Sequence, residues 1–166
     1  MNKCVFYDTD PTGHEEYDIS GEQYHSLLET CFKYSASFSI ALSPGCKADL
    51  SKWDSYRIPV EDNVKALYSH YGDPNAVYAD KIGDYEIRQY KLCPELRHLI
   101  AQHTDSIFSW LCGWGFDNPD DPAFFREDGS VFFSSTIHEG ECALYLKATE
   151  SLPENLLDEK WTKDSP

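Results

Sequence analysis

Basic residues are scarce in this 166-residue chain. Lysine and arginine together number 14, against 29 aspartates and glutamates, which gives a formal net charge of −15 and a pI near 4.6. A chain with this balance repels phosphate backbones, so we expect no nucleic acid partner. Within residues 1–30 Lys3 is the lone basic residue. The acidity favours either simple solubility or a partner with a basic face.

Long apolar runs and clustered cysteines are also missing. No stretch approaches the roughly 20 apolar residues of a membrane span. The short apolar stretch after Met1 ends at Asp8, which is not the pattern of a secretory leader. The six cysteines contain no Cys-x-x-Cys pair. We therefore expect a cytoplasmic protein with reduced thiols and no membrane partner.

The common catalytic and metal-binding motifs are absent as well. There is no Gly-x-Ser-x-Gly elbow, and Gly113-Trp114-Gly115 is not followed by the Lys-Ser/Thr of a phosphate loop. Two segments rich in His and Glu, 14–16 and 138–141, lack the His-x-x-x-His spacing that places two imidazoles on one helix face. The sequence thus predicts no catalytic set, no metal site and no cofactor.

The segment "VFYDTDPTG", residues 5–13, offers one enzymatic alternative. An apolar strand that runs into Asp-x-Asp-x-Thr-Gly resembles the opening of the active site in haloacid-dehalogenase-type phosphatases. That resemblance implies Asp8 as nucleophile, Asp10 as acid/base and a bound Mg²⁺. It also implies a buried parallel sheet, whereas the strand predicted at 36–42 alternates with serine. A plain turn around Pro11 is the preferred interpretation.

Hydrophobic residues (41%) and aromatic residues (14%) are abundant enough to exclude disorder. We predict an α+β fold with one domain over residues 1–150, and a tail or short docking helix over 151–166. The sheet is expected to be largely antiparallel, with a C-terminal β-meander packed against two or three helices. The length of the chain suffices for one core.

Hydrophobic periodicity and turn residues predict the individual elements. Ser20 and Gln23 spell a capping box before the first helix. Pro94 opens a helix whose apolar spacing continues through Leu111, with a break at Thr104-Asp105, before glycines end it. Residues 53–58 are a candidate strand. For residues 76–90 the sequence fits either paired strands or an irregular segment, and it does not distinguish the two. The predicted elements are strands at 3–7 and 36–42, helices at 21–34, 61–71 and 94–111, and a meander at 123–126, 131–134 and 142–146.

The segment 110–117 is the densest unusual patch of the sequence. One interpretation is a helix end that inserts Trp110 and Phe116 into the core, since bulky aromatic side chains dominate cores. In the other, Trp114 is exposed beside Asp117, Asp120 and Asp121, and acts as an aromatic anchor surrounded by acid.

Residues 118–146, "NPDDPAFFREDGSVFFSSTIHEGECALYL", carry a second resemblance. A Pro-acid-acid segment leads to a Phe-Phe strand, a Gly turn, an aromatic strand and Ser-x-x-His-Glu. This order resembles small bacterial proteins of the immunity or inhibitor type that are found beside toxins; the match departs from that pattern at Pro122 and Ala123. The matching residues are Pro119, Asp120, Asp121, Phe124, Phe125, Gly129, Phe132, Phe133, Ser135, His138 and Glu139.

The resemblance implies an α+β domain with a protein partner. Together with the net charge, it predicts a non-catalytic acidic protein that binds and neutralises a basic, toxin-like partner. The alternatives are the Mg²⁺-dependent phosphatase and an acidic structural protein without an inhibitory role. The predicted partner-binding residues are Trp114, Asp117, Asp120, Asp121, His138 and Glu139.

Overall fold

A computed structural model describes residues 2–7, 18–73, 75, 81–113, 115–158 and 161–164. It is an α+β domain built on one antiparallel sheet with strand order β11-β1-β10-β9-β8-β2-β5-β3, in which β4 also pairs with β5. The strands of this sheet are β1 (Asn2–Tyr7), β2 (Ser37–Leu42), β3 (Arg57–Ile58), β4 (Lys81–Ile82), β5 (Tyr85–Lys91), β8 (Asp120–Phe125), β9 (Val131–Thr136), β10 (Glu141–Leu146) and β11 (Trp161–Asp164).

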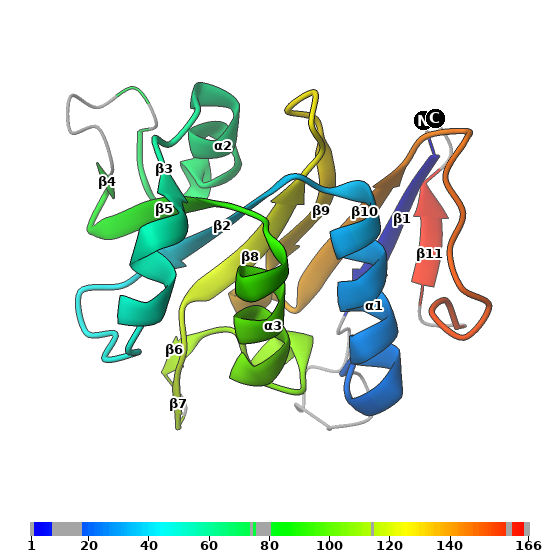
Figure 1. Cartoon of the computed structure of the whole chain (residues 1–166), viewed down its shortest axis with the longest axis horizontal. Coiled ribbons are helices and arrows are strands. Elements are labelled where there is room, and N and C mark those ends of the chain that lie inside the picture. Colours follow the sequence, from blue (N-terminus) through cyan, green and yellow to red (C-terminus); the bar gives the residue numbers. More distant parts are fainter. Residues whose placement is uncertain are drawn as a thin grey trace.

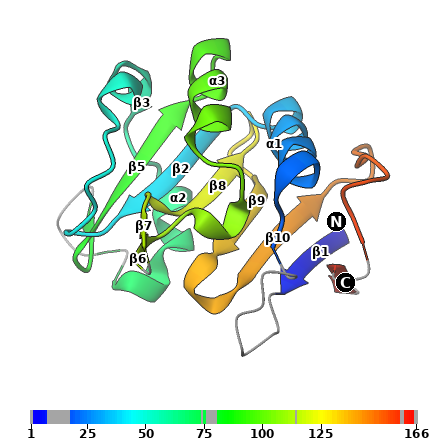
Figure 2. The ribbon, with the colours of Figure 1, turned by 90° about the horizontal axis from the view of Figure 1, so that it is seen from below.

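Helices cover both faces of the sheet. Figures 1 and 2 show α1 and α3 side by side on one face and α2 on the opposite face. A separate small hairpin, β6 (Cys112–Gly113) and β7 (Phe116–Asp117), projects beyond the sheet (Figure 1). The helices are α1 (Gly21–Tyr34), α2 (Asp62–Leu67) and α3 (Pro94–His103), with 3₁₀ turns η2 (Ser51–Tyr56), η3 (Ser69–Tyr71), η4 (Ile107–Ser109) and η5 (Ile137–Glu139).

The alternating side chains of strand β2 pack into two separate hydrophobic cores, one on each face of the sheet. Phe38 and Ile40 point into the larger core beneath α1 and α3, while Ala41 packs into a smaller core with Val64 of α2. The serine face predicted for this strand is therefore buried rather than solvated. Ser39 is fully buried, and its hydroxyl forms a 2.7 Å hydrogen bond with the Tyr68 hydroxyl. Ser37 is also buried, and its hydroxyl accepts from the Gln89 side chain at 3.1 Å, so both serines within β2 have the hydrogen-bond partner that a buried polar group needs.

Helix α1 has the predicted bounds but not the predicted cap. The Ser20 side chain makes no capping hydrogen bond, and residue 20 instead forms a β-bridge with Ser106. The Gln23 side chain donates to the Leu156 carbonyl at 2.8 Å and so fastens the C-terminal segment to the helix. The helix is held by burial of one face against the sheet, the usual source of helix stability in proteins.

Helix α3 begins at Pro94 as predicted and ends at His103, earlier than its apolar spacing indicates. After η4 the chain turns, and Trp110 is buried with its indole N–H donating to the Tyr24 hydroxyl at 2.9 Å. The prediction that Trp110 enters the core is confirmed. The same prediction for Phe116 is wrong, because this residue lies on the β6–β7 hairpin and its side chain is 45% exposed.

The C-terminal meander β8–β9–β10 is confirmed, with antiparallel pairing throughout. A β-bulge between β8 and β9 shifts the register at Phe124/Phe125, and both Phe132 and Phe133 reach the larger core. Residues 151–158 then follow an irregular path, and β11 adds to the sheet edge beside β1. A strand, not a helix, thus occupies residues 161–164.

The structure also assigns elements to the described residues between β2 and α3, where the sequence pattern was ambiguous. The predicted strand at 53–58 is wrong for most of its length, because residues 51–56 form the η2 turn and only Arg57–Ile58 pair with β5. The predicted helix at 61–71 divides into α2 and η3. Residues 81–91 form the β4–β5 hairpin, which is one of the two interpretations offered for 76–90. Residues 76–80 lie outside the described residues.

Candidate functional site

Two consecutive carboxylates lie at the start of β8. The side chains of Asp120 and Asp121 are both fully buried. Asp121 has a φ of 52°, the left-handed region that few residues other than glycine adopt. A buried pair of acids beside an unusual backbone conformation is the kind of feature that concentrates at functional sites. The partners of these acids decide what the pair can do.

Each carboxylate is covered by a histidine. His138 Nε2 lies 2.9 Å from Asp120 Oδ1, and His70 Nε2 lies 3.1 Å from Asp121 Oδ2. The imidazole side chains are 39% and 34% exposed, respectively. The two rings therefore lie between the buried acids and solvent.

Asp121 is held by several further donors. The Tyr71 hydroxyl donates to Oδ2, and the Ile137 N–H donates to Oδ1 at 2.7 Å. The Tyr68 hydroxyl donates to the Asp121 carbonyl at 3.0 Å, which leaves the Tyr68 oxygen to accept from Ser39. This network joins η3, β8 and η5, three segments that are far apart in sequence.

Asp120 is less well satisfied. The Cys112 N–H contacts its Oδ1 at 3.4 Å, while Oδ2 is buried without a hydrogen-bond partner. Burial, and secondarily the charge of Asp121, raises the pKa of Asp120 to about 6, although the contact with His138 opposes the rise. The hydrogen bond to Asp121 raises the pKa of His70. Burial and hydrogen bonding within the cluster thus raise the pKa of both Asp120 and His70 above their ordinary values.

Access to the acids is closed. A hollow of about 120 Å³ lies over β1, β9 and β10 and is lined by Lys3, Ser134, Thr136, Glu141 and Tyr145 among others. A second hollow, of about 290 Å³, lies beside the β2–β5 end of the sheet. Neither is lined by Asp120 or Asp121. Full burial of both side chains is compatible with a structural role for the pair.

Asp120 also contacts the β6–β7 hairpin. Asp120 contacts the backbone of Cys112 at the first residue of β6, and Cys112 pairs directly with Asp117 across the hairpin. Also at the base of the hairpin, the Asn118 side chain donates to the Ser109 carbonyl at 2.7 Å. Phe116 and Asp117 are both exposed on this anchored hairpin. Phe116 is the large apolar side chain that stands out as exposed among the described residues.

The six predicted partner-binding residues divide into three groups. Asp117, His138 and Glu139 are exposed, so their placement is compatible with contact to a partner. Asp120 and Asp121 are buried, and the expectation that they display charge at the surface is wrong, because histidines, tyrosine and backbone N–H groups enclose them. Trp114 lies outside the described residues.

Sequence analysis missed the contributions of His70, Tyr71 and Phe116. The first two reach Asp121 from about fifty positions away, and no local spacing signals such a contact. The order Tyr68-Ser69-His70-Tyr71 is the one available hint, since tyrosine and histidine hydrogen-bond readily to buried carboxylates.

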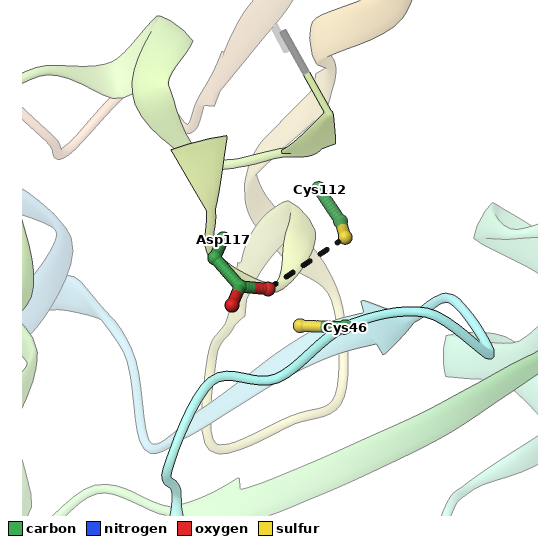
Figure 3. A group of neighbouring side chains, drawn as sticks. All are labelled: Cys46, Cys112 and Asp117. Atoms are coloured by element: carbon green, nitrogen blue, oxygen red, sulfur yellow. Dashed lines mark hydrogen bonds between the residues drawn. The ribbon is translucent and has the colours of Figure 1, made fainter. Parts of the chain in front are cut away.

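A second polar group lies on the same hairpin. Cys46, Cys112 and Asp117 converge, and Figure 3 shows their side chains pointing toward one another. Of the two segments rich in His and Glu, 14–16 lies outside the described residues, and His138 is paired with Asp120. Asp8 and Asp10 of the phosphatase alternative also lie outside the described residues.

Comparison with models of protein families, with curated proteins and with solved structures returns no match. Across the described part of the chain, no helix is both long and apolar enough to cross a membrane. The chemistry of the side chains must therefore carry the functional argument.

Proposed function

We propose that this chain is a non-catalytic, acidic protein-binding module that neutralises a basic, toxin-like partner, and that the β6–β7 hairpin is its main contact surface. The observation that carries the proposal is Phe116, a large aromatic residue that is 45% exposed on a hairpin whose base is held by contacts at Cys112 and Asn118. Exposed aromatic side chains on rigid supports are typical anchors of protein interfaces, because they bury much area at little entropic cost.

Charge supports the same interpretation. Asp117 is exposed next to Phe116, and Glu139 is exposed on η5, adjacent to the His138 that covers Asp120. The net charge of −15 adds a long-range attraction for cationic proteins. An apolar anchor supplies affinity, while charge complementarity accelerates association. The resemblance of residues 118–146 to immunity-type proteins points to the same class of partner.

The phosphatase alternative receives no support from the sheet. The named strand pairings are all antiparallel, whereas that alternative implies a parallel sheet with ligands at the carboxyl ends of its strands. The enclosed Asp120–Asp121 pair likewise offers no open acid for catalysis. A binding role needs neither feature.

The proposal is tested by affinity capture at low salt from the cells that produce the protein, followed by reconstitution with the captured partner. Wild type should retain a basic protein in stoichiometric amount. Phe116→Ser should weaken the reconstituted complex by about 2 kcal/mol or more, which is roughly 30-fold in Kd. Glu154→Gln, which removes an exposed acid in the turn before Leu156, is the matched control and should bind as wild type does.

Two outcomes would count against a hairpin-based interface. In the first, no basic protein is retained, and the acidity then serves solubility alone. In the second, a basic protein is retained equally by wild type and Phe116→Ser, which would place the contact elsewhere on the molecule. Salt dependence is a further check, since the Debye length falls from about 8 Å at 0.15 M to about 3 Å at 1 M.

A further inference from the structure

Three ligand-bearing side chains from distant parts of the chain meet at one point. One sulfur atom each from Cys46 and Cys112 and one carboxylate oxygen of Asp117 all lie within 4.8 Å of one another. Figure 3 shows the three side chains directed into the space between the loop after β2 and the β6–β7 hairpin. Cys46 and Cys112 are half-buried and Asp117 is exposed, so an ion from solvent can reach all three.

Backbone interactions hold these side chains in place. Cys112 and Asp117 are directly opposite each other in the β6–β7 pairing. Cys46 follows a turn in which its N–H donates to the Ser43 carbonyl at 3.1 Å. The loop and the hairpin are joined by the Lys47 N–H, which donates to Asp117 Oδ1 at 2.7 Å. This last bond orients the carboxylate in the way that outer-shell donors orient metal ligands.

The distances suit a tetrahedral ion. Zn²⁺ binds thiolate sulfur at about 2.3 Å and carboxylate oxygen at about 2.0–2.2 Å, so neighbouring ligand atoms in a tetrahedron lie roughly 3.5–3.8 Å apart. Cys112 Sγ lies 3.9 Å from Asp117 Oδ1. That separation is long for a hydrogen bond but close to the spacing of two ligands on one ion.

We propose that Cys46, Cys112 and Asp117 form a binding site for a soft divalent metal ion, for which Zn²⁺ is the best match. Paired sulfur ligands select zinc over calcium or magnesium, which prefer oxygen alone. A water molecule completes the tetrahedron. Binding converts both thiols to thiolates, so two protons leave for each ion bound, and affinity falls as the pH is lowered.

The competing interpretation is a redox pair in which Cys46 and Cys112 form a disulfide. Both cysteines are free in this structure. A disulfide also gives no role to the Asp117 carboxylate, which converges on the sulfurs with its own backbone donor. A metal ion accounts for all three side chains, and it fastens the hairpin that carries Phe116 to the loop after β2. Metal binding here does not require the protein partner proposed above.

Titration of the metal-free protein with Co²⁺, in the presence of a reductant that is not a thiol, tests the site. Wild type should bind one equivalent and develop a sulfur-to-cobalt charge-transfer band together with the visible bands of tetrahedral cobalt. One equivalent of Zn²⁺ should abolish both. Cys46→Ser and Cys112→Ser should lose the charge-transfer intensity at equal cobalt. Asp117→Asn should keep the band but bind at least about 10–100-fold more weakly, the loss that follows removal of even an outer-shell group.

Cys93→Ser is the matched control, because Cys93 is also a half-buried free cysteine but lies at the start of α3. Its titration should match that of wild type. Far-ultraviolet circular dichroism of each variant checks the fold, and Cys46→Ala replaces Cys46→Ser if the serine variant unfolds. The proposal is overturned if reduced wild type gives no charge-transfer band, or if the band survives in both Cys46 variants. If the intact mass of the purified protein is two hydrogens below that of the fully reduced chain, and the reduced protein gives no charge-transfer band with Co²⁺, the two cysteines are a redox pair instead.

Discussion

Replacement of Asp120 by asparagine tests whether its buried charge is an energetic cost to the folded protein. The side chain is fully buried, Oδ2 has no hydrogen-bond partner, and Asp121 adds a second negative charge beside it. Asparagine keeps an oxygen that accepts from the Cys112 N–H and from His138, while it removes the charge. The substitution therefore changes electrostatics with little change in shape.

The size of the effect follows from the pKa of Asp120, which burial raises from 3.8 to about 6. Because the folded pKa lies above the unfolded one, this carboxyl contributes stability that is full below pH 3.8 and is lost as the pH rises through 6. About two pKa units at 1.36 kcal/mol each give a loss of about 3 kcal/mol between pH 4 and pH 8. Asparagine has no such dependence.

Urea unfolding of wild type and Asp120→Asn at intervals from pH 4 to pH 8 measures this difference directly. The free energy of unfolding of the variant, relative to wild type, should rise by about 3 kcal/mol over this interval, equivalent to about 6–12 °C in Tm. The variant should be the more stable protein at pH 8.

Asp105→Asn is the control, because Asp105 is exposed. Its stability relative to wild type should stay within about 0.5 kcal/mol at every pH. The reasoning is refuted if the advantage of Asp120→Asn is constant with pH, or if it shrinks as the pH rises. Either result would mean that Asp120 is favourably ionised in the folded protein.

Two further predictions concern stability. The side chains of Arg126 and Glu150 are each 7% exposed and form two hydrogen bonds of 2.6 Å. Arg126→Met should cost about 3–5 kcal/mol in urea unfolding, because it leaves a buried carboxylate without its ion-pair partner. Lys147→Met, which breaks an exposed ion pair with Asp128, should cost less than about 1 kcal/mol. If the two variants lose equal stability, burial of the Arg126–Glu150 pair does not set the size of the loss. Gly83 has a φ of +59°, and an added Cβ would lie 2.2 Å from the Tyr71 carbonyl oxygen. Gly83→Ala should therefore lower the free energy of unfolding by more than about 1 kcal/mol. Gly45→Ala is the control and should be close to neutral, because there is open space around Gly45. If Gly83→Ala is as stable as wild type, the β4–β5 turn is not constrained in this way.

The fold was predictable where local pattern and tertiary packing agree. Helix α1 has strong apolar periodicity over four turns, and the β8–β9 hairpin has the Asp128-Gly129 turn. The break predicted at Thr104-Asp105 coincides with the end of α3 at His103, whereas the helical spacing of Ile107 and Leu111 wrongly predicted that the helix resumes after it. There the buried contact of Trp110 with Tyr24 outweighs local propensity.

The candidate site was predictable only in part, for a related reason. Asp120 and His138 stand out in the sequence as charged residues near aromatic ones, and the structure does bring these two together. Whether an aspartate is exposed or enclosed depends on partners such as His70, which arrive from another segment. The convergence of Cys46 on Cys112 is equally invisible in the sequence, because α2, α3 and the strands β3, β4 and β5 lie between them.

The most direct test of the binding role is the affinity and association rate of the reconstituted complex, measured for wild type and Phe116→Ser at low salt and at 1 M salt. The proposed interface predicts that high salt slows association of both proteins, and that Phe116→Ser raises Kd about 30-fold or more at either salt concentration. Equal Kd values for the two proteins, or association that is indifferent to salt, would contradict it.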